Sequence, residues 1–360
     1  MRRRDFFKTA TLASAATLAA PHVVTAQATF TWRMTSAYGP RAAFYSVGPG
    51  SATDLIQRIQ TMSSNRLRIQ FFGAGELVPA FEGFDAASAG TVEMNYGNSY
   101  FWTGKSFAAQ YFTAVPFGLN FQGMNGWLYD GGGMDLWRET YDRFNLVPIP
   151  CGNTGVQMTG WFRKPIESIA DLRGLKMRIP GLAGRVYQQF GVDVRLLPGG
   201  EIFPALERGV IDAAEFVGPF LDRQLGLHRV AKNYYTTGWH ETATVSEVAI
   251  NKTAWNRLPN ELKAIVENAC AACNVVSEAW AQKNNAEALD DLVTNHQVVA
   301  RPLPDSVVDE LRKANDKVLE AGLTDPLVKK VHDSYFAYYA KYAKWTALSE
   351  GVYHAKVRPS

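Results

Sequence analysis

The sequence lacks any apolar run of the roughly 18 residues that a membrane-spanning helix needs. It has only three cysteines, and this odd number argues against a framework of disulfide bonds. Charged residues make up only 20% of the chain and hydrophobic ones 47%, which excludes a disordered chain and a coiled coil. What remains is a globular protein whose 360 residues are enough for two domains, each with its own core.

Several local motifs of enzymes are also missing. The chain has no phosphate-binding G-x-x-x-x-G-K-[ST] motif, no G-x-G-x-x-G after a strand, no H-E-x-x-H and no G-x-S-x-G. Cys270 and Cys273 have CxxC spacing, but without a second pair or nearby histidines we interpret them as helix packing. A hydrolase whose triad assembles only in space stays open, because such a triad leaves no local pattern.

The first 28 residues have the layout of an export signal. Residues 2–8 read RRRDFFK, a weakly apolar stretch follows at 9–20, and residues 26–28 form a small-residue cleavage site. The RRDFFK portion resembles the bacterial twin-arginine signal. This segment carries four basic and one acidic side chain, so removing it takes the net charge from +3 to zero. We therefore expect a periplasmic protein with no nucleic-acid partner.

After this signal, strand-like and helix-like segments alternate, which is typical of α/β domains with largely parallel sheets. Alternating apolar residues predict strands at 29–35, 66–72, 92–96, 156–162, 175–179, 192–196, 213–217 and 244–250. Helices are predicted at 52–62, 135–143, 182–190, 202–208, 260–293, 306–321 and 325–353. No linker separates two domains, so we expect strands that cross between two lobes and leave a hinged cleft.

Arg178 is the first candidate for a binding residue. It ends the apolar-alternating segment 175–179, just before a Pro-Gly turn, and ligands of open α/β sheets bind beyond such strand ends. A guanidinium there offers a two-pronged fit to a carboxylate. The alternative is a surface arginine paired with an aspartate.

Glu215, Glu241 and Gln157 each lie among apolar neighbours at the end of an apolar segment. A carboxylate in such surroundings is costly unless a cation compensates it. Each residue alone could be a satisfied core group, but together they suit a hard cation such as Ca²⁺ or Na⁺ rather than zinc. The aromatic residues 100–102 either line a pocket for a small organic acid or belong to the hydrophobic core.

Three segments, in this order, resemble the extracytoplasmic solute-binding subunits of tripartite ATP-independent periplasmic (TRAP) transporters, the DctP family. They are FGAGEL (72–77), GLKMRI (174–179) and ALERGVID (205–212). The resemblance covers nearly all of the chain after the signal. It implies an α/β, two-lobed periplasmic binding protein (type II-like) with hinge-connected lobes and long C-terminal helices. It also implies that Arg178 anchors a carboxylate and that the chain is not an enzyme.

The phrases GNTGVQ (152–157), AEFVGP (214–219) and GWHE (238–241) resemble a subgroup that binds 2-oxo or 2-hydroxy monocarboxylates through a bridging cation. Pyruvate, lactate and longer 2-oxo acids are the expected ligands. Implied ligands of Ca²⁺ or Na⁺ are the side chains of Gln157, Glu215 and Glu241 and the carbonyl of Phe216. Implied contacts of the bound acid are Arg178, Gln157, Asn153, Tyr100, Phe101 and Trp102. Phe216 and His240 stand where the resemblance implies tryptophan, so a pocket of different size is expected.

Counting charges favours Ca²⁺. Two glutamates, one arginine and one monocarboxylate carry a net −2, which Ca²⁺ neutralises and Na⁺ leaves at −1.

The resemblance also implies the small and large TRAP membrane subunits as partners. The helix expected at 325–353 carries an aromatic stripe wide enough either for packing within the chain or for a homodimer. We divide the chain into a signal (1–28), lobe I (29–150 plus about 243–285), lobe II (151–242 plus about 286–324) and a C-terminal helix (325–360). Two other functions stay open, a metal-assisted enzyme acting on a 2-oxo acid and a sensor module that presents its ligand to a receptor.

Overall fold

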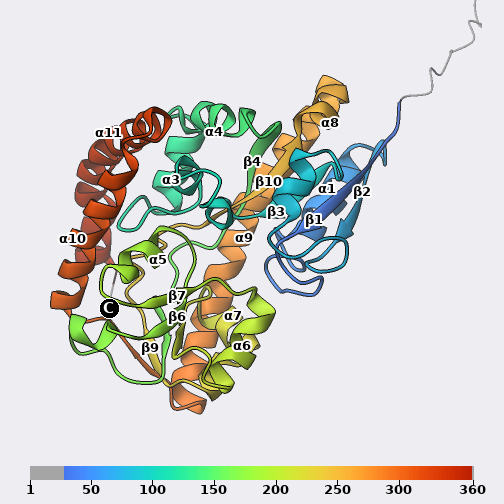
Figure 1. Ribbon diagram of the computed structural model, residues 1–360. Coiled ribbons are helices and arrows are strands. Elements are labelled where there is room, and N and C mark those ends of the chain that lie inside the picture. Colours follow the sequence, from blue (N-terminus) through green and yellow to red (C-terminus); the bar gives the residue numbers. More distant parts are fainter. Residues whose placement is uncertain (1–27, 359–360) are drawn as a thin grey trace, which may run out of the picture.

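The computed structural model describes residues 28–358, which form two β-sheets surrounded by helices (Figure 1). The first sheet has five strands in the order β2-β1-β3-β10-β4, and we call the body around it lobe I. Its strands are β1 (Phe30–Ser36), β2 (Leu67–Phe72), β3 (Met94–Gly97), β4 (Leu146–Asn153) and β10 (Val245–Asn251). The predicted export signal at 1–28 lies outside the described residues, apart from its last position.

The second sheet has six strands in the order β11-β9-β5-β8-β6-β7, and we call the body around it lobe II. Its strands are β5 (Gly160–Phe162), β6 (Lys176–Arg178), β7 (Asp193–Arg195), β8 (Ala213–Ala214), β9 (Asn233–Tyr235) and β11 (Val299–Arg301). Most of them are only two or three residues long, so this sheet depends on the packing of the surrounding helices.

Within residues 28–358 each sheet has a single strand that runs against the others, β10 in lobe I and β5 in lobe II, so the prediction of largely parallel sheets is confirmed. In lobe I, β1 is parallel to β2 and β3, but β10 is antiparallel to β3 and β4. In lobe II, β5 is antiparallel to β8 and β9, while the other pairs are parallel. The opposite direction of β10 in lobe I follows from the path of the chain. The chain leaves lobe I through β4 and returns to it through β10, so these neighbouring strands run in opposite directions.

The two connections between the sheets, residues 154–159 and 236–244, lie side by side. The backbone N–H of Gln157 donates to the carbonyl of Glu241 at 3.0 Å, and that of Thr154 to the carbonyl of Thr244 at 3.2 Å. The strand predicted at 156–162 is therefore real only as β5, because its first residues belong to the crossing. This pair of crossing segments is the expected link between the lobes.

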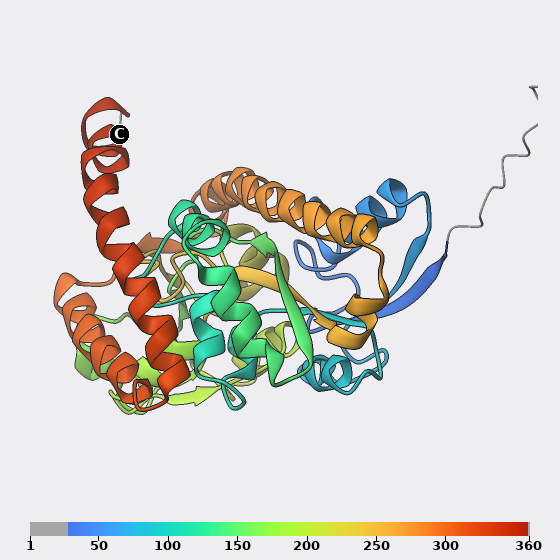
Figure 2. The ribbon, with the colours of Figure 1, turned by 90° about the horizontal axis from the view of Figure 1, so that it is seen from above.

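The long helix α9 (Asn260–Asn295) runs along both lobes (Figures 1 and 2). It packs on α1 (Ala52–Met62) and β4 of lobe I and on α7 (Pro219–Leu225) of lobe II. Cys270 and Cys273 are buried in the core of lobe I without a disulfide, which agrees with their interpretation as helix packing. Leu292, about five helical turns beyond Cys273, lies in the core of lobe II.

The other helices are α2 (Gly83–Ser88), α3 (Phe121–Tyr129), α4 (Gly133–Asp142), α5 (Gly181–Gln188), α6 (Gly199–Glu207), α8 (Lys252–Arg257), α10 (Asp305–Gly322), α11 (Pro326–Leu348) and α12 (Glu350–Val352). In Figure 1, α10 and α11 lie on the opposite side from β1 and β2. α10 packs on α5, and α11 packs on α3 and α4. The helix predicted at 325–353 is interrupted at Ser349, where the backbone leaves helical geometry.

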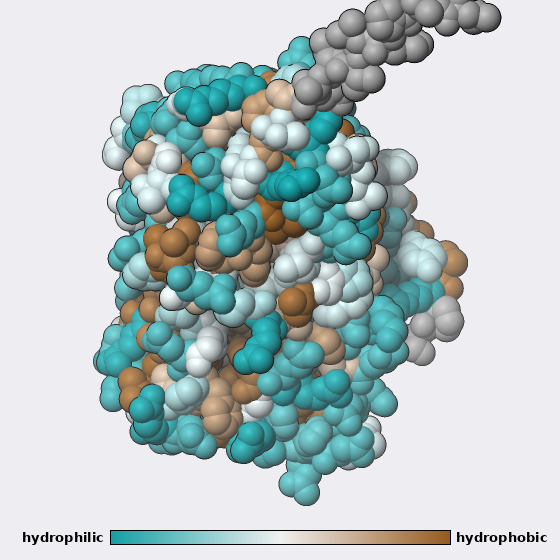
Figure 3. Space-filling view, turned by 90° about the vertical axis from the view of Figure 1, so that its right-hand side faces the viewer, coloured by the Kyte–Doolittle hydropathy of each residue, from teal (hydrophilic) through white to brown (hydrophobic). Residues whose placement is uncertain are grey.

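Hydrophilic residues cover much of the face shown in Figure 3, with apolar residues in patches among them. None of the helices within residues 28–358 is both long and apolar enough to cross a membrane.

Candidate functional site

Arg178 and Glu215 meet at one edge of the lobe II sheet. Arg178 ends β6 and Glu215 follows β8, and because these strands are parallel neighbours their carboxyl ends lie together. Arg178 Nη1 donates to Glu215 Oε2 at 3.0 Å and to the Glu215 carbonyl at 2.7 Å, and Nε donates to the Leu197 carbonyl at 3.2 Å. Arg178 is only 3% exposed and Glu215 is fully buried. The alternative of a surface arginine paired with an aspartate is therefore wrong.

Gln157 and Glu241 come from the two crossing segments. The amide nitrogen of Gln157 donates to the hydroxyls of Thr244 at 2.9 Å and Thr154 at 3.1 Å. The Thr244 hydroxyl in turn donates to Glu241 Oε2. These bonds fix the amide so that its oxygen, which is buried, has no hydrogen-bond partner among the described residues. Gln157 thus offers an oxygen to any ligand of the site.

His240 completes a cluster with the two glutamates. Glu215, His240 and Glu241 each have one potential ligand atom within 4.8 Å of the others. His240 Nε2 lies 3.7 Å from Glu215 Oε1, which is too far for a hydrogen bond. This oxygen and both ring nitrogens are buried without a partner in the described part of the chain. Since each such atom costs about 1–3 kcal/mol, the cluster is of the kind that an added ion satisfies.

From the sequence, His240 was predicted to change the pocket size and was the one candidate base for a metal-assisted enzyme, but its place in this cluster was missed. Its position directly before Glu241 was the available signal. The side chains of adjacent residues in an extended segment normally point in opposite directions. The sequence therefore favoured only one of His240 and Glu241 as a member of the site.

Burial dominates the electrostatics of the cluster. It raises the pKa of Glu215 to about 7, against the opposing effect of the Arg178 guanidinium. It raises the pKa of Glu241 to about 8, and the charge of Glu215 adds to this rise. Burial also lowers the pKa of His240 to about 4, which favours the neutral imidazole. One guanidinium therefore does not suffice to stabilise two carboxylates here, and a further cation would.

The predicted aromatic residues divide into two groups. Tyr100 is buried, and the pKa of its hydroxyl is raised by burial and, next, by the charge of Glu241. Phe101 packs against Phe81, with 4.7 Å between the ring centroids. Trp102 turns into the core of lobe I, where its indole donates to Glu247 at 2.9 Å. Trp102 thus takes the core role that the sequence left open.

Asn153 lies at the end of β4, where the first crossing segment begins. Its side-chain oxygen accepts from the Gly155 backbone N–H at 2.9 Å, and its amide nitrogen is buried without a partner among the described residues. The side chain shapes the turn into the crossing, and its NH2 group stays available as a donor as far as residues 28–358 are concerned.

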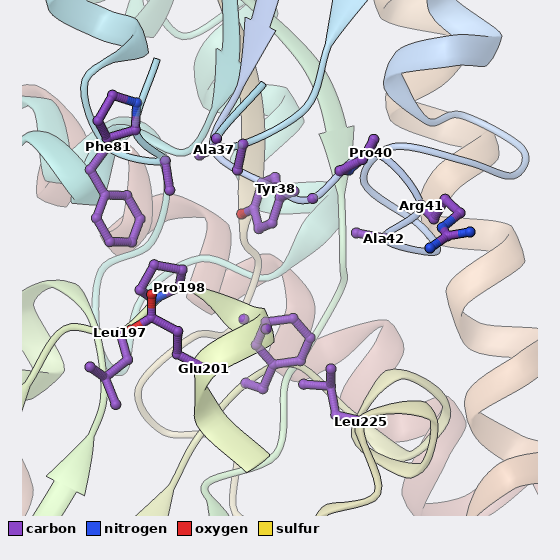
Figure 4. Close-up of a pocket in the computed structure, with 18 of the residues that line it drawn as sticks. Ala37, Tyr38, Pro40, Arg41, Ala42, Phe81, Leu197, Pro198, Glu201 and Leu225 are labelled. Atoms are coloured by element: carbon purple, nitrogen blue, oxygen red, sulfur yellow. The ribbon is translucent and has the colours of Figure 1, made fainter. Parts of the chain in front are cut away.

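A cleft of about 960 Å³ lies between the lobes. Loops at 37–43 and 74–82 line it from lobe I, and segments 196–201 and 216–225 line it from lobe II. Figure 4 shows these walls, with labels on Ala37, Tyr38, Pro40, Arg41, Ala42, Phe81, Leu197, Pro198, Glu201 and Leu225. Most of the lining side chains are apolar, apart from charged groups at positions 41, 82 and 201.

The cleft leads to Arg178. Leu197 and Phe216 both line it, and Leu197 accepts the hydrogen bond from Arg178 Nε. The Phe216 ring centroid lies 5.7 Å from the guanidinium carbon of Arg178. The polar cluster is thus buried directly behind one wall of an apolar opening.

Comparison with known proteins agrees with this arrangement. The model of the family described as "Bacterial extracellular solute-binding protein, family 7" (DctP) matches residues 46–324. A protein of Nostoc sp. (strain PCC 7120), named a monocarboxylate 2-oxoacid-binding periplasmic protein, is 39% identical over 358 residues, which cover 97% of each chain.

Two crystal structures share the fold. A TRAP periplasmic solute-binding protein of Pseudoalteromonas atlantica with bound sodium and pyruvate is 36% identical, with a TM-score of 0.88 over 92% of this chain and 100% of that one. A TRAP solute-binding protein of Bordetella bronchiseptica, a dimer with calcium and picolinate in one site and none in the other, is also 36% identical, with a TM-score of 0.87 over 91% and 97%. The predicted two-lobed α/β fold with long C-terminal helices is confirmed, and the chain belongs to the DctP family of bacterial extracellular solute-binding proteins.

Proposed function

We propose that this protein captures a small 2-oxo or 2-hydroxy monocarboxylate in the periplasm and delivers it to the small and large membrane subunits of a TRAP transporter. The observation that carries this proposal is the buried cluster of Arg178, Glu215 and Glu241 behind an apolar cleft between two lobes. Such a cluster can bind the charged carboxylate of a ligand, whereas the apolar cleft can hold the rest of a small organic molecule. The ligands named for the relatives from Nostoc and Pseudoalteromonas support the assignment.

Arg178 is the proposed anchor of the ligand carboxylate. Its Nε and Nη1 already have protein partners, and none of the hydrogen bonds within residues 28–358 uses Nη2. For Arg178 to bind the ligand carboxylate through two hydrogen bonds, the Glu215 carboxylate must therefore release Nη1. A cation beside Glu215 supports that exchange, because it offers the carboxylate another positive partner.

The residues present fit a hard cation. We propose that Gln157, Glu215, Glu241 and the Phe216 carbonyl hold Ca²⁺ or Na⁺, which would supply positive charge to the protein and to the bound acid. Oxygen donors of this kind suit both ions. The net charge of two carboxylates, one guanidinium and one monocarboxylate favours Ca²⁺, since the site is fully buried. The calcium and sodium bound by the Bordetella and Pseudoalteromonas proteins support this set.

Lobe closure, rather than the making or breaking of a bond, is the proposed action. The boundaries of lobe I (29–150 plus about 243–285), lobe II (151–242 plus about 286–324) and the C-terminal helix (325–360) belong to this proposal. The paired crossing segments at 154–159 and 236–244 carry ligand residues themselves, so binding and hinge geometry are coupled. Recovery of the bound acid unchanged after incubation, as measured by NMR, is expected, whereas chemical conversion would favour a metal-assisted enzyme.

Calorimetry tests the ligand. The protein is unfolded and refolded to remove copurified acids, then titrated with pyruvate, lactate and 4-methyl-2-oxopentanoate in Ca²⁺ or Na⁺. We expect saturable binding of at least one acid, weakened at least about tenfold when a chelator is used in Na⁺-free buffer. Absence of binding heat with all three acids in either cation would show that the ligand class is wrong.

We propose further that a twin-arginine signal in residues 1–28 exports the chain and that the C-terminal helix forms a homodimer. The end of this helix projects beyond the body of the protein (Figure 2) and exposes Trp345 and Leu348, whose side chains are 66% and 80% exposed. Val328, Val331 and Tyr335, near its start, are buried within the chain. The aromatic stripe thus packs internally at one end and offers an apolar surface at the other.

A further inference from the structure

We propose that His240 is a nitrogen ligand of the cation site, so that this protein binds a divalent transition ion such as Mn²⁺ there. This inference rests on the proposed function, because it concerns the ion that accompanies the acid. It differs from that proposal in the donor set and therefore in the class of metal.

The geometry of His240 carries the inference. Its side chain is fully buried, and Nε2 lies 3.7 Å from Glu215 Oε1. Two donors that share one transition ion lie about 3 to 4 Å apart, because each bond is about 2.0–2.2 Å long. The separation is thus too long for a hydrogen bond and suitable for two ligands of one ion.

Within residues 28–358 no hydrogen bond assigns the imidazole another role. Both ring nitrogens of His240 lack a hydrogen-bond partner among the described residues, and so does Glu215 Oε1. The amide oxygen of Gln157, held in place through Thr244, is unpartnered as well. Glu241 completes the group, since one of its oxygens lies within 4.8 Å of the ligand atoms of Glu215 and His240. An ion among these atoms would satisfy several of them together.

A histidine nitrogen changes which metal ion is preferred by a site that otherwise has oxygen ligands. Carboxylate and amide oxygens suit Ca²⁺ and Mn²⁺, whereas imidazole nitrogen suits transition ions and adds little for Ca²⁺. The His240 ring should therefore raise the affinity for Mn²⁺ relative to Ca²⁺. A chain with a hydrocarbon side chain at this position would lack that gain.

Pulsed electron paramagnetic resonance of the Mn²⁺-loaded protein tests the ligand directly. We expect ¹⁴N modulation from a coordinated imidazole in the wild type and its loss in His240→Phe. The matched control is His228→Phe, a buried histidine that packs against His296 instead of the cluster. This control should keep the ¹⁴N signal. Bound Mn²⁺ without ¹⁴N coupling in the wild type would overturn the proposal.

Competition calorimetry gives a second readout. We expect His240→Phe to lower the Mn²⁺ affinity at least about tenfold, since the loss of a residue that only supports a ligand already costs that much, and the Ca²⁺ affinity by much less. His240→Asn serves as a second variant if the first melts at a much lower temperature. Loss of acid binding in His240→Phe with an unchanged Mn²⁺-to-Ca²⁺ ratio would mean that the ring contacts the acid instead. Failure of the wild type to bind any 2-oxo acid would refute the proposed function, whereas the ¹⁴N result reports on His240 alone.

Discussion

At the scale of single residues, Arg178 is held in position by the protein itself. Its hydrogen bonds to the backbone carbonyls of Leu197 and Glu215 fix the guanidinium at the end of β6 before a ligand binds. Such preorganisation reduces the conformational entropy that binding would otherwise cost. Lysine has a single charged nitrogen and could not reproduce this fork.

We therefore expect Arg178→Lys to weaken binding of the 2-oxo acid at least about 100-fold, as measured by calorimetry. Arg195→Lys is the matched control, because Arg195 lies opposite Arg178 on the neighbouring strand β7 and its side chain is 39% exposed. Arg195→Lys should bind the 2-oxo acid with the affinity of the wild type. Wild-type affinity in Arg178→Lys would show that two-pronged recognition is absent.

Glu247 in β10 is a buried carboxyl outside the cluster, in the core of lobe I. Its Oε1 accepts from Trp102 and Tyr141, and its Oε2 has no partner within the described residues. Burial raises its pKa to about 7. Its titratable neighbours are Tyr141 and Cys151, and burial raises the pKa of each well above its ordinary value, so both stay neutral at neutral pH. The fold therefore favours the protonated form of Glu247.

This raised pKa makes stability depend on pH. The folded protein holds a proton on Glu247 between pH 4.5 and 7 that the unfolded chain has released, so the free energy of unfolding falls as the pH rises through this window. The loss is about 3 kcal/mol at most. We expect Glu247→Gln to lack this loss in urea unfolding at pH 5 and pH 8. Glu287→Gln, with a 64% exposed side chain, should keep it. Equal pH dependence in both variants would contradict the expectation.

Much of the site could be inferred from residue types alone. Arg178, Glu215, Glu241 and Gln157 stood out because charged or amide groups lay among apolar neighbours, and the structure brings all four together. Their roles as ligands stay predictions. The sequence could not show that the ring of His240 points the same way as Glu241, because this depends on how the crossing segment 236–244 bends.

At the scale of elements, α9 joins the two lobes, and Gly50 marks its tight contact with the loop before α1. A Cβ at Gly50 would lie 2.6 Å from the Ser277 backbone nitrogen and 2.7 Å from the Cys273 carbonyl oxygen. Gly50 also has φ of +75°, which favours glycine. The opposing atoms belong to the backbone of α9, so they cannot move aside cheaply.

Gly50→Ala is therefore expected to lower the free energy of unfolding by several kcal/mol, of order 3. Gly75→Ala isolates the backbone effect, because Gly75 has a similar φ of +82° and open space where its Cβ would be. This control should cost only about 1 kcal/mol. Urea unfolding compares the two. Similar losses in the free energy of unfolding for both variants would mean that the loop with Gly50 is not in tight contact with α9.

Long amphipathic elements could be predicted from the sequence, whereas short or crossing ones could not. The helix predicted at 52–62 agrees with α1, since its apolar face is regular and Ser51 caps its start. β4 was missed because Pro148 and Pro150 interrupt the pattern of a strand that is nearly all buried. β9 and β11 have three residues each, too few to show any periodicity.

At the scale of the whole molecule, the C-terminal helix reaches away from both lobes (Figure 2). Trp345 and Leu348 lie near the end of α11, where large apolar side chains are exposed. A second copy of the chain that covers this end would remove that apolar area from water.

The double variant Trp345→Glu, Leu348→Glu should convert a dimer into a monomer without changing acid binding, as measured by analytical ultracentrifugation and calorimetry. Charged groups at a buried interface are costly, so association should weaken by at least about tenfold. Val293→Glu places the same charge on an exposed apolar site of α9 and should leave the dimer intact. A monomeric wild type, or a double variant that stays dimeric, would refute the dimer.

In the proposed complex, one arginine and one cation hold a carboxylate between two lobes. A crystal structure of the protein with pyruvate and Ca²⁺ tests this most directly. We expect the acid's carboxylate within hydrogen-bond distance of the Arg178 guanidinium and the ion in contact with Gln157, Glu215 and Glu241. A structure in which the acid binds elsewhere, with Arg178 still paired only with Glu215 and Leu197, would contradict the account.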